Sequence, residues 1–356
     1  MNPIVEKILH LAVNAPSGDN SQPWQFQSEN LKFDIINLPY RDNPIFNFQQ
    51  RGSLIAHGAL IQNIILLAPV FGYEAKIELL PKKQKSDIIA TVTLLPTSKQ
   101  VEKTNICELI QNRVTNRKKY QNIKLTNEQK QQLLETRLEN NLADLLLIEN
   151  KDKIMRIAQA SSAAERIMLE YQPLHQAFFS MVRWNKSEEA KEKCGMFIDT
   201  LELKPPQKLI FKWFSNWKKA NILRKIGMPT FVAKENSKIY SSAATVAAIV
   251  MPNTEPENFI RTGMILQNFW LKATELSLSL QPMAGVLYLE QNLMAGGLND
   301  LNANLKSLVT NSVQNIYNAF GNPRGIITML FRLGKSNSPS ACSAKFPPVI
   351  NLKQNV

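Results

Sequence analysis

Cysteine is scarce in this chain of 356 residues, which has three: Cys107, Cys194 and Cys342. They lie far apart and form no C-x-x-C pair. An odd number of widely spaced cysteines argues against a disulfide framework and favours a reducing compartment. We expect each of them to be a small buried or surface residue and not a catalytic thiol.

Histidine is equally scarce, with His10, His57 and His175 isolated from one another. None has metal-ligand spacing or an obvious carboxylate partner, which argues against a zinc site and against a catalytic triad. His57 falls in a strongly apolar stretch, so we expect a core or interface histidine there. No metal site is predicted.

Nucleotide-binding motifs and long apolar runs are also missing. No G-x-G-x-x-G follows a strand-like stretch and no G-x-x-x-x-G-K-[ST] occurs, so neither a Rossmann site nor a P-loop is supported. The longest apolar candidate, residues 60–73, is interrupted by Gln62 and Asn63 and falls short of the ~20 residues of a membrane span. The opening segment carries Glu6 and no basic leader, which predicts a mature helix and a cytoplasmic protein.

The composition is that of a globular protein with excess positive charge. Hydrophobic residues make up 44%, the formal net charge is +13 and the pI is about 9.5. A chain of this length can bury one large core or two moderate ones. The charge favours anionic partners, which include phosphate-bearing cofactors, nucleic acid and membrane surfaces, without choosing among them.

The most informative stretch is residues 15–24, APSGDNSQPW. Its two prolines fix φ and lack N–H groups, and Gly18 lets the backbone approach a flat ligand closely. Ser17, Asn20 and Gln22 supply hydrogen-bond donors and acceptors. This composition fits a recognition loop, and it also fits an ordinary connection between a helix and a strand.

Hydrophobic periodicity indicates alternating helices and strands. Helices are predicted at 3–14, 53–68, 106–112, from 126 onward and at 258–277, and strands at 24–26, 31–36, 75–80, 88–95, 143–148 and 327–334. The helix at 53–68 is apolar nearly all round, so it should be buried centrally. Thr126 and Gln129 form a capping-box pattern.

Two of the predicted helices carry an internal repeat. Residues 58–68 and 263–273 share the pattern G-x-x-x-Q-N-x-x-L-x-A. Chance similarity between two buried helices is the alternative, but a Gln-Asn pair is not a natural core filler, which favours duplication of one α/β unit. The polar, lysine-rich passage from 96 to 105 is the predicted boundary between a first half, 1–104, and a second half, 105–356.

The string at 15–24 resembles the flavin-contacting loop of the FMN-dependent nitroreductase superfamily, A-P-S-G-x-N-x-Q-P-W. The usual unit there is a homodimer with flavin at the interface, and this chain resembles two fused subunits with one site kept, as in the single-chain Acg-like branch. The likeness is strongest at 15–24, 51–68, 113–120 and 258–285. It implies an α+β, nitroreductase-like fold in two tandem halves, an intramolecular pseudo-dimer and hence a monomer.

The resemblance also implies the residues that hold FMN. They are Pro16, Ser17, Gly18, Asn20, Gln22, Arg113, Thr115, Arg117, Pro282, Met283, Ala284, Gly285 and Lys345. Arg113, Thr115 and Arg117 would grip the phosphate, where paired guanidinium groups match a dianion. By itself R-x-T-x-R also fits an exposed basic turn, Lys345 also fits a solvated side chain, and the role of Arg332 stays open. The segment 282–285 matches a P-x-x-G motif whose backbone N–H lies near flavin N5.

Residues 170–240 exceed a minimal nitroreductase-like half and form an insertion. Within its basic stretch 208–225, one helical face carries Ile210, Trp213, Phe214 and Trp217, and lysines occupy another. Such a helix can lie on an anionic membrane, whereas the resemblance implies a packed lid over the flavin. We expect the lid, with membrane association unfavoured and no nucleic-acid partner.

The predicted function is that of an FMN-binding oxidoreductase. Hydride from NAD(P)H or another donor would pass through flavin N5 to a nitroaromatic, quinone or similar planar acceptor. The alternative is a non-catalytic FMN-storage protein whose lid, carrying Trp213 and Trp217, closes the acceptor pocket. A third class is a flavin-less scaffold or membrane-associated protein.

Overall fold

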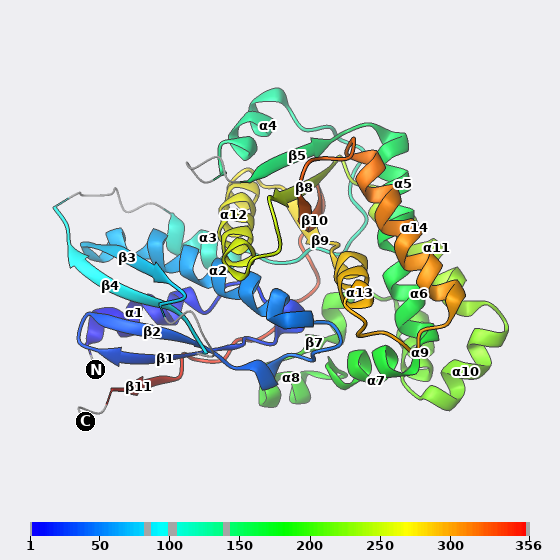
Figure 1. Ribbon diagram of the computed structural model, residues 1–356, viewed down its shortest axis with the longest axis horizontal. Helices are drawn as coiled ribbons and strands as arrows, with labels where there is room; N and C mark the ends of the chain where they lie inside the picture. Colours follow the sequence, from blue (N-terminus) through cyan, green and yellow to red (C-terminus); the bar gives the residue numbers. More distant parts are fainter. Residues whose placement is uncertain (1, 82–86, 99–104, 138–142, 354–356) are drawn as a thin grey trace.

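The computed structural model describes residues 2–81, 87–98, 105–137 and 143–353 (Figure 1). The helices are α1 Pro3–Ala12, α2 Arg51–Leu67, α3 Ile106–Asn112, α4 Asn127–Leu134, α5 Lys151–Ser161, α6 Ala163–Glu170, α7 Gln172–Ser180, α8 Lys186–Glu192, α9 Pro205–Phe214, α10 Trp217–Lys225, α11 Met228–Tyr240, α12 Pro256–Glu275, α13 Gly285–Met294 and α14 Ala303–Ala319. The strands are β1 Trp24–Glu29, β2 Lys32–Asn37, β3 Tyr73–Leu79, β4 Ile88–Pro96, β5 Asp144–Ile148, β6 Val182–Arg183, β7 Met196–Phe197, β8 Thr245–Met251, β9 Ser279–Pro282, β10 Ile326–Gly334 and β11 Ile350–Leu352. The predicted α+β class is confirmed.

Two antiparallel sheets repeat one topology. In chain order, β1 and β2 precede α2, and β3 and β4 follow it; their sheet order is β1-β2-β4-β3. Likewise β5 and β8 precede α12, and β9 and β10 follow it, with sheet order β5-β8-β10-β9. Every neighbouring pair in both sets is antiparallel. The shared connectivity is what duplication of one unit would leave.

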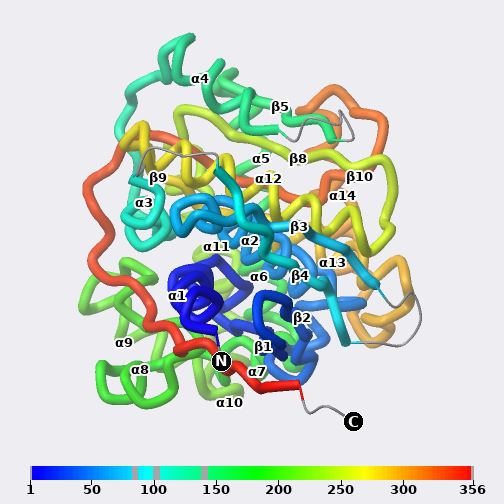
Figure 2. Tube along the Cα trace, turned by 90° about the vertical axis from the view of Figure 1, so that its left-hand side faces the viewer, coloured from blue at the N-terminus to red at the C-terminus, as the bar shows by residue number. Residues whose placement is uncertain are grey.

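The end of the chain returns to the first sheet. β11 pairs in parallel with β1, in the register Phe26 to Ile350 and Ser28 to Leu352. Figure 2 shows this segment running from the second sheet, past the insertion, to the edge beside the N-terminus. The C-terminal tail therefore links the two sheets.

The central helices α2 and α12 cross at two glycines. A Cβ on Gly58 would lie 1.8 Å from the carbonyl oxygen of Ile260, and one on Gly263 would lie 1.9 Å from that of Ile55. Each carbonyl precedes the other glycine by three residues, so the contact is reciprocal. Only glycine allows so close an approach of the two backbones.

The Gln-Asn pairs of the repeat meet in this crossing. The side-chain amide of Gln267 donates to Oδ1 of Asn63 at 2.7 Å, and Asn63 Nδ2 donates to the carbonyl of Ala12 at 3.0 Å. These bonds offset part of the cost of burying the amides, although the side-chain oxygen of Gln267 has no partner among the described residues. The polar pair is therefore part of the contact between the two halves.

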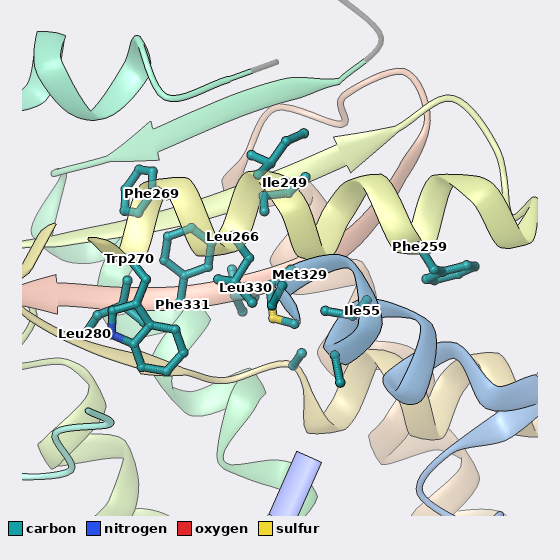
Figure 3. Close-up of a cluster of buried hydrophobic side chains, with 14 of the residues drawn as sticks. Ile55, Ile249, Phe259, Leu266, Phe269, Trp270, Leu280, Met329, Leu330 and Phe331 are labelled. Carbon is teal, nitrogen blue, oxygen red and sulfur yellow. The ribbon is translucent and has the colours of Figure 1, made fainter. Parts of the chain in front are cut away.

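Around the crossing lies a large apolar core. Trp270, Phe269 and Phe331 are almost fully buried, and the rings of Phe269 and Phe331 lie 4.8 Å apart (Figure 3). The prediction of a central, buried helix at 53–68 is confirmed, since nearly all of α2 is buried.

The expectation that no apolar segment is long enough to span a membrane was wrong. The helical segment Phe48–Phe71, 24 residues with a mean hydropathy of 1.9, is long and apolar enough to cross a membrane. It is 72% buried within the protein, because α2 packs on α12. This burial is typical of the core helix of a soluble protein.

Other local expectations are confirmed with small shifts of boundary. Thr126 Oγ1 accepts from the Gln129 N–H at 3.1 Å, and the Gln129 side chain accepts from the Thr126 N–H at 3.0 Å, so the capping box is formed. β4 ends at Pro96, and of the predicted boundary passage residues 99–104 lie outside the described residues.

The insertion has a small core of its own, built on Phe179, Phe197 and Phe214. The prediction of one helical face across 210–217 was wrong. α9 ends at Phe214 and α10 begins at Trp217, because the Asn216 side chain accepts from the Lys219 N–H at 3.2 Å and caps a new helix.

Candidate functional site

The loop at 15–24 has an unusual backbone. Asp19, Asn20 and Gln22 have φ of 46°, 56° and 49°, in the left-handed region that non-glycine residues seldom adopt. The hydroxyl of Ser17 accepts from the Gln22 N–H at 3.0 Å and helps to hold this shape. Such local strain persists only where surrounding contacts fix it, and it is concentrated at binding sites.

A cavity of about 280 Å³ opens beside this loop. It is lined by Asn14, Pro16, Ser17, Asp19, Asn20, Gln111, Arg113, Val114, Thr115, Arg117, Met196, Thr200, Ala341, Cys342, Ser343 and Lys345. Four distant parts of the chain meet here: the loop, the end of α3 with the segment after it, the insertion and the C-terminal tail. The structure thus brings together Pro16, Ser17, Asn20, Arg113, Thr115, Arg117 and Lys345 of the residues predicted from the sequence.

Arg113 lies deepest among the cations, with 9% of its surface exposed. Its Nη2 donates to the carbonyl of Asn14 at 3.1 Å, and its guanidinium stacks over Trp270 at 4.4 Å from the ring centroid. Within the described part of the chain, its buried Nε has no hydrogen-bond partner. Burial lowers the pKa of Arg113 to about 10, which still leaves it charged at neutral pH.

Two further cations face the cavity. Arg117 Nη1 donates to the carbonyl of Thr200 at 3.2 Å, and Lys345 Nζ donates to the carbonyl of Ala15 at 3.0 Å. Burial, and secondarily Arg113, lowers the pKa of Lys345 to about 7, against the opposing effect of Glu189. Over the described residues, no carboxylate oxygen lies within 4.0 Å of a side-chain nitrogen of Arg113, Arg117 or Lys345. The cavity therefore holds uncompensated positive charge.

The nearby carboxyls do little to cancel that charge. Burial raises the pKa of Asp19 although Arg117 opposes the shift. Burial together with the neighbouring Asp19 raises the pKa of Asp42 to about 7, while Ser21 and a backbone N–H act against this. Two carboxyls that resist ionisation, beside two arginines and a lysine that is about half charged at neutral pH, favour an anionic ligand.

Arg332, left open by the sequence, has a structural role. It is fully buried and donates to the side-chain oxygen of Gln281 at 2.9 Å. It also donates to the carbonyls of Ile239 and Lys118, each at 2.8 Å, and stacks on Tyr120 at 3.9 Å. These bonds tie β10 to the segment that carries Arg117 and leave Arg332 outside the cavity lining.

The side-chain amide of Gln22 forms its hydrogen bonds within the protein. Its Nε2 donates to the carbonyl of Lys193 at 2.7 Å, and its Oε1 accepts from the Phe346 N–H at 2.8 Å. Asn20 Nδ2 likewise donates to the carbonyl of Ala344 at 2.9 Å. These amides hold the loop to the insertion and to the tail. Of the pair, only Asn20 also lines the cavity, and the exposed Gly18 does not.

Pro282, Met283, Ala284 and Gly285 also lie outside the cavity lining. The Met283 N–H donates to the carbonyl of Leu330 at 2.7 Å. β9 lies directly against the arginine segment, because the Asn116 N–H donates to the carbonyl of Leu280 at 3.0 Å. A role of these four residues at flavin N5 stays a prediction.

The insertion contributes side chains that no sequence pattern indicated. Met196 and Thr200 line the cavity, whereas Trp213 is 59% exposed and Trp217 packs against His175 at 5.0 Å between centroids. Neither tryptophan lines this cavity, and their closing of an acceptor pocket stays a prediction. Asp19 and Cys342, also missed, had a weak signal in their closeness along the chain to Asn20 and Lys345.

A second hollow lacks these properties. A more open depression of about 630 Å³ is lined by Pro3, Glu6, Lys7, His10, Leu11 and Phe71. Its lining includes both acidic Glu6 and basic Lys7, so its charge is not of one sign. We take the smaller, cationic cavity as the candidate site.

No family model matches the sequence. A curated relative, the uncharacterized protein MT1398 of Mycobacterium tuberculosis (strain CDC 1551 / Oshkosh), is 23% identical over 350 residues, which cover 96% of this chain and 47% of that protein. The chain thus spans about half the length of this relative.

Among solved structures, a nitroreductase with bound FMN from Desulfitobacterium hafniense DCB-2 is similar at 13% identity and a TM-score of 0.35, covering 67% of this chain and 92% of its own. An FMN-dependent nitroreductase from Clostridium difficile R20291 is similar at 12% identity and a TM-score of 0.37, and the match covers 69% of this chain and 97% of that one. The FMN-dependent nitroreductase NfnB from Mycobacterium smegmatis, in complex with NADPH, is similar at 12% identity and a TM-score of 0.37. That match covers 65% of this chain and 86% of NfnB.

Proposed function

We propose that this protein binds FMN in the cationic cavity and acts as an FMN-dependent oxidoreductase. The observation that carries the proposal is the meeting of the loop at 15–24 with Arg113, Arg117 and Lys345 around one hollow. These are the segments for which the sequence resemblance implies opposite ends of one flavin. The bound FMN of the similar Desulfitobacterium hafniense nitroreductase agrees with this ligand.

The donor set fits a phosphate group. Arg113 and Arg117 provide fork-shaped guanidinium groups that match a dianion, and Lys345 adds a point charge. The unpartnered Nε of Arg113 is a buried donor that a phosphate oxygen would satisfy. At about 280 Å³ the hollow lies near the lower limit of ligand pockets, so it suits the phosphate end of the cofactor.

The remaining predicted contacts are assigned to the ring end. Pro16 and Ser17 line the same hollow, and β9, which leads into Pro282–Gly285, lies against the arginine segment. When bound, FMN supplies hydride transfer through its N5 position. The protein's own part is to hold the phosphate, orient the ring and place a positive field beside it.

The proposed donor is NAD(P)H, and the proposed acceptor is a nitroaromatic, a quinone or a similar planar molecule. NfnB in complex with NADPH provides a precedent for a nicotinamide donor in a similar structure. Neither Trp213 nor Trp217 lines the cavity, so no contact in the described structure speaks for a storage function. We therefore do not retain storage as a second candidate.

We further propose that the chain is an intramolecular pseudo-dimer of Acg-like type, monomeric and cytoplasmic. The repeated sheet topology and the reciprocal contact of Gly58 and Gly263 support it. So does the tail, which carries Lys345 across to the first sheet. One fused chain would thereby supply both sides of a flavin site.

The test is anaerobic reduction of the FMN-loaded protein. NADH or NADPH should bleach the yellow colour within the time of mixing, and a nitroaromatic or a naphthoquinone should restore it. Flavin that stays oxidised with both nicotinamides, in protein that retains FMN through gel filtration, would refute the oxidoreductase proposal while leaving FMN binding intact. Protein that never retains FMN would refute both.

A further inference from the structure

The insertion carries an uninterrupted block of positive charge. Residues 203–234 contain eight Lys or Arg residues and no Asp or Glu, with Glu202 and Glu235 as the nearest acidic residues on either side. The basic residues are Lys204, Lys208, Lys212, Lys218, Lys219, Arg224, Lys225 and Lys234. Lys208 is paired with Asp199, which lies outside the block. Charge of one sign over such a length attracts an anionic partner.

The same block exposes large apolar side chains. In the part of the chain that the structure describes, fourteen large hydrophobic residues are exposed, and six of them fall within residues 209–231. They are Leu209 at 70%, Ile210 at 46%, Trp213 at 59%, Ile222 at 65%, Ile226 at 70% and Phe231 at 55% exposed. Phe214 and Ala220 bury the opposite sides of α9 and α10 in the insertion's core, so this exposure is not a failure to pack. A concentration of exposed apolar groups marks an interaction surface.

The two features occupy one surface. Leu209 and Trp213 lie one turn apart on α9, and Lys219 Nζ from α10 lies 5.2 Å from the centroid of the Trp213 ring. Ile222 follows Lys219 by three residues, and Ile226 follows Ile222 by four, which continues the row along α10. In Figure 1, α9 and α10 form an outlying corner of the molecule. We call this surface, made of Leu209, Ile210, Trp213, Lys218, Lys219, Ile222 and Ile226, the basic apolar face.

We propose that the basic apolar face docks the protein onto the surface of an anionic lipid bilayer. Aliphatic and tryptophan side chains enter the boundary between headgroups and acyl chains, while lysines and arginines meet the lipid phosphates. The long stems of the lysines allow their ammonium groups to reach the headgroups as the apolar groups sink. The sequence-based expectation against a membrane rested on packing of Ile210 and Trp213, and both are exposed.

Two other occupants fit less well. Nucleic acid would satisfy the charge, but a phosphate backbone gives no apolar partner to Leu209, Ile222 and Ile226. A second copy of the chain would bring the same positive charge to the contact and repel it. An anionic bilayer alone supplies both a negative surface and an apolar interior.

Co-sedimentation with vesicles tests the proposal. The full-length protein should sediment with phosphatidylcholine vesicles that contain about 30% phosphatidylglycerol and stay in solution with pure phosphatidylcholine. The double variant Lys218→Glu/Lys219→Glu should weaken binding at least about tenfold, because each basic group near such a surface is worth roughly 1 kcal/mol. The control Lys32→Glu/Lys76→Glu, on exposed strand positions of the first sheet, should bind like the parent.

Tryptophan emission gives a readout tied to one residue. Binding should shift the emission to shorter wavelength, and Trp213→Phe should remove most of that shift. Of the five tryptophans, Trp24 and Trp270 are buried, Trp184 and Trp217 pack against the insertion's core, and Trp213 is the exposed one. Leu209→Ser/Ile222→Ser should weaken binding, whereas Met294→Ser, at an equally exposed site on α13, should not. All replaced side chains are exposed, so the thermal unfolding temperature should be unchanged. Measuring it verifies that each variant is folded.

Failure to bind anionic vesicles, or equal binding by the charge-reversed and parent proteins, would overturn the proposal. Saturable binding to RNA or DNA with no binding to vesicles would replace it with a nucleic-acid surface. Association into dimers that Leu209→Ser/Ile222→Ser abolishes, without lipid binding, would replace it with a contact between copies.

Discussion

Gly58 and Gly263 lie against each other where α2 crosses α12. A Cβ on Gly58 would lie 3.0 Å from the Cα of Gly263, and each glycine faces the carbonyl three residues before the other. This reciprocity joins the two repeated units and fixes how the loop of one half meets the arginine segment of the other. Each of the two helices also supports one side of the cavity, because Asn63 of α2 bonds to Ala12 ahead of the loop and Trp270 of α12 lies under Arg113.

Gly58→Ala should destabilise the protein by about 2–3 kcal/mol or more, because a methyl group would overlap the Ile260 carbonyl and force the helices apart. Thermal or urea unfolding measures this loss. The matched control is Gly52→Ala in the first turn of the same helix, where a Cβ would lie 3.2 Å from the side-chain oxygen of Asn47. It should change stability by less than about 1 kcal/mol. Equal stability of both variants would contradict the account of the crossing.

Gln22→Ala should loosen the C-terminal tail. The replacement leaves the Phe346 N–H without its partner and leaves the Lys193 carbonyl with only the longer 3.5 Å bond from Asn20, at a cost of roughly 1–3 kcal/mol. The free energy of local opening at the Phe346 amide should fall by about the same amount, so its hydrogen exchange should become faster by tenfold or more. Gln25→Ala in the neighbouring strand should leave that amide unchanged. An unchanged exchange rate in Gln22→Ala would show that the two hydrogen bonds of the Gln22 side chain do not stabilise the tail.

The affinity for FMN should fall as the pH rises through neutrality. Lys345 has a pKa of about 7 in the free protein, so its positive charge is present below that pH and lost above it. From pH 6.5 to 8.5, the dissociation constant of FMN should increase, by about tenfold or less, as a charge-assisted contact is lost. Flavin fluorescence quenching measures it.

Lys345→Arg supplies the control, because an arginine keeps its charge over this range. Its affinity should depend less steeply on pH, and the remaining dependence comes from ionisation of Asp19 and Asp42. If the wild-type affinity were as flat as that of the arginine variant, Lys345 would not contribute charge to the site.

The stability of the free protein should fall between pH 5 and pH 8 because of Asp42. Its pKa is raised to about 7, whereas an unfolded aspartate loses its proton near pH 4. Between these values the folded state binds the extra proton, so stability falls as the pH rises to about 7 and then levels off. The loss should be roughly 1–3 kcal/mol.

Asp42→Asn should reduce this slope and be the more stable protein at pH 8. The slope should not vanish, because Asp19 has a raised pKa and titrates in the same direction. Tyr288 also faces Asp42 but stays neutral throughout, since burial raises its pKa. Parallel stability curves for the two proteins would show that Asp42 ionises normally.

Periodicity and local motifs predicted most of the secondary structure. The capping box at Thr126, the short helix Ile106–Asn112 and the buried helix α2 follow from signals within a few residues of each other. The repeated Gln-Asn pattern also indicated the two helices that form the crossing. Local chemistry decides these features, so a single sequence is enough to find them.

Features that depend on tertiary contacts were harder to predict. Asn216 splits an amphipathic stretch into two helices and leaves Trp213 exposed where the periodicity predicted packing. Met196 and Thr200 reach the cavity only because the insertion folds back on the loop. Gln22 was expected to contact a ligand, but its partners, Lys193 and Phe346, lie more than 170 residues away along the chain.

The most direct test of the central claim compares FMN with riboflavin, which lacks the phosphate. We predict that the wild-type protein binds FMN at least about tenfold more tightly than riboflavin, since a charged hydrogen bond is worth roughly 1.5–3 kcal/mol. Arg117→Ala should remove most of that preference while leaving riboflavin affinity unchanged. Equal affinities for the two flavins in the wild type, or an unaltered preference in Arg117→Ala, would contradict the placement of the phosphate beside Arg113, Arg117 and Lys345.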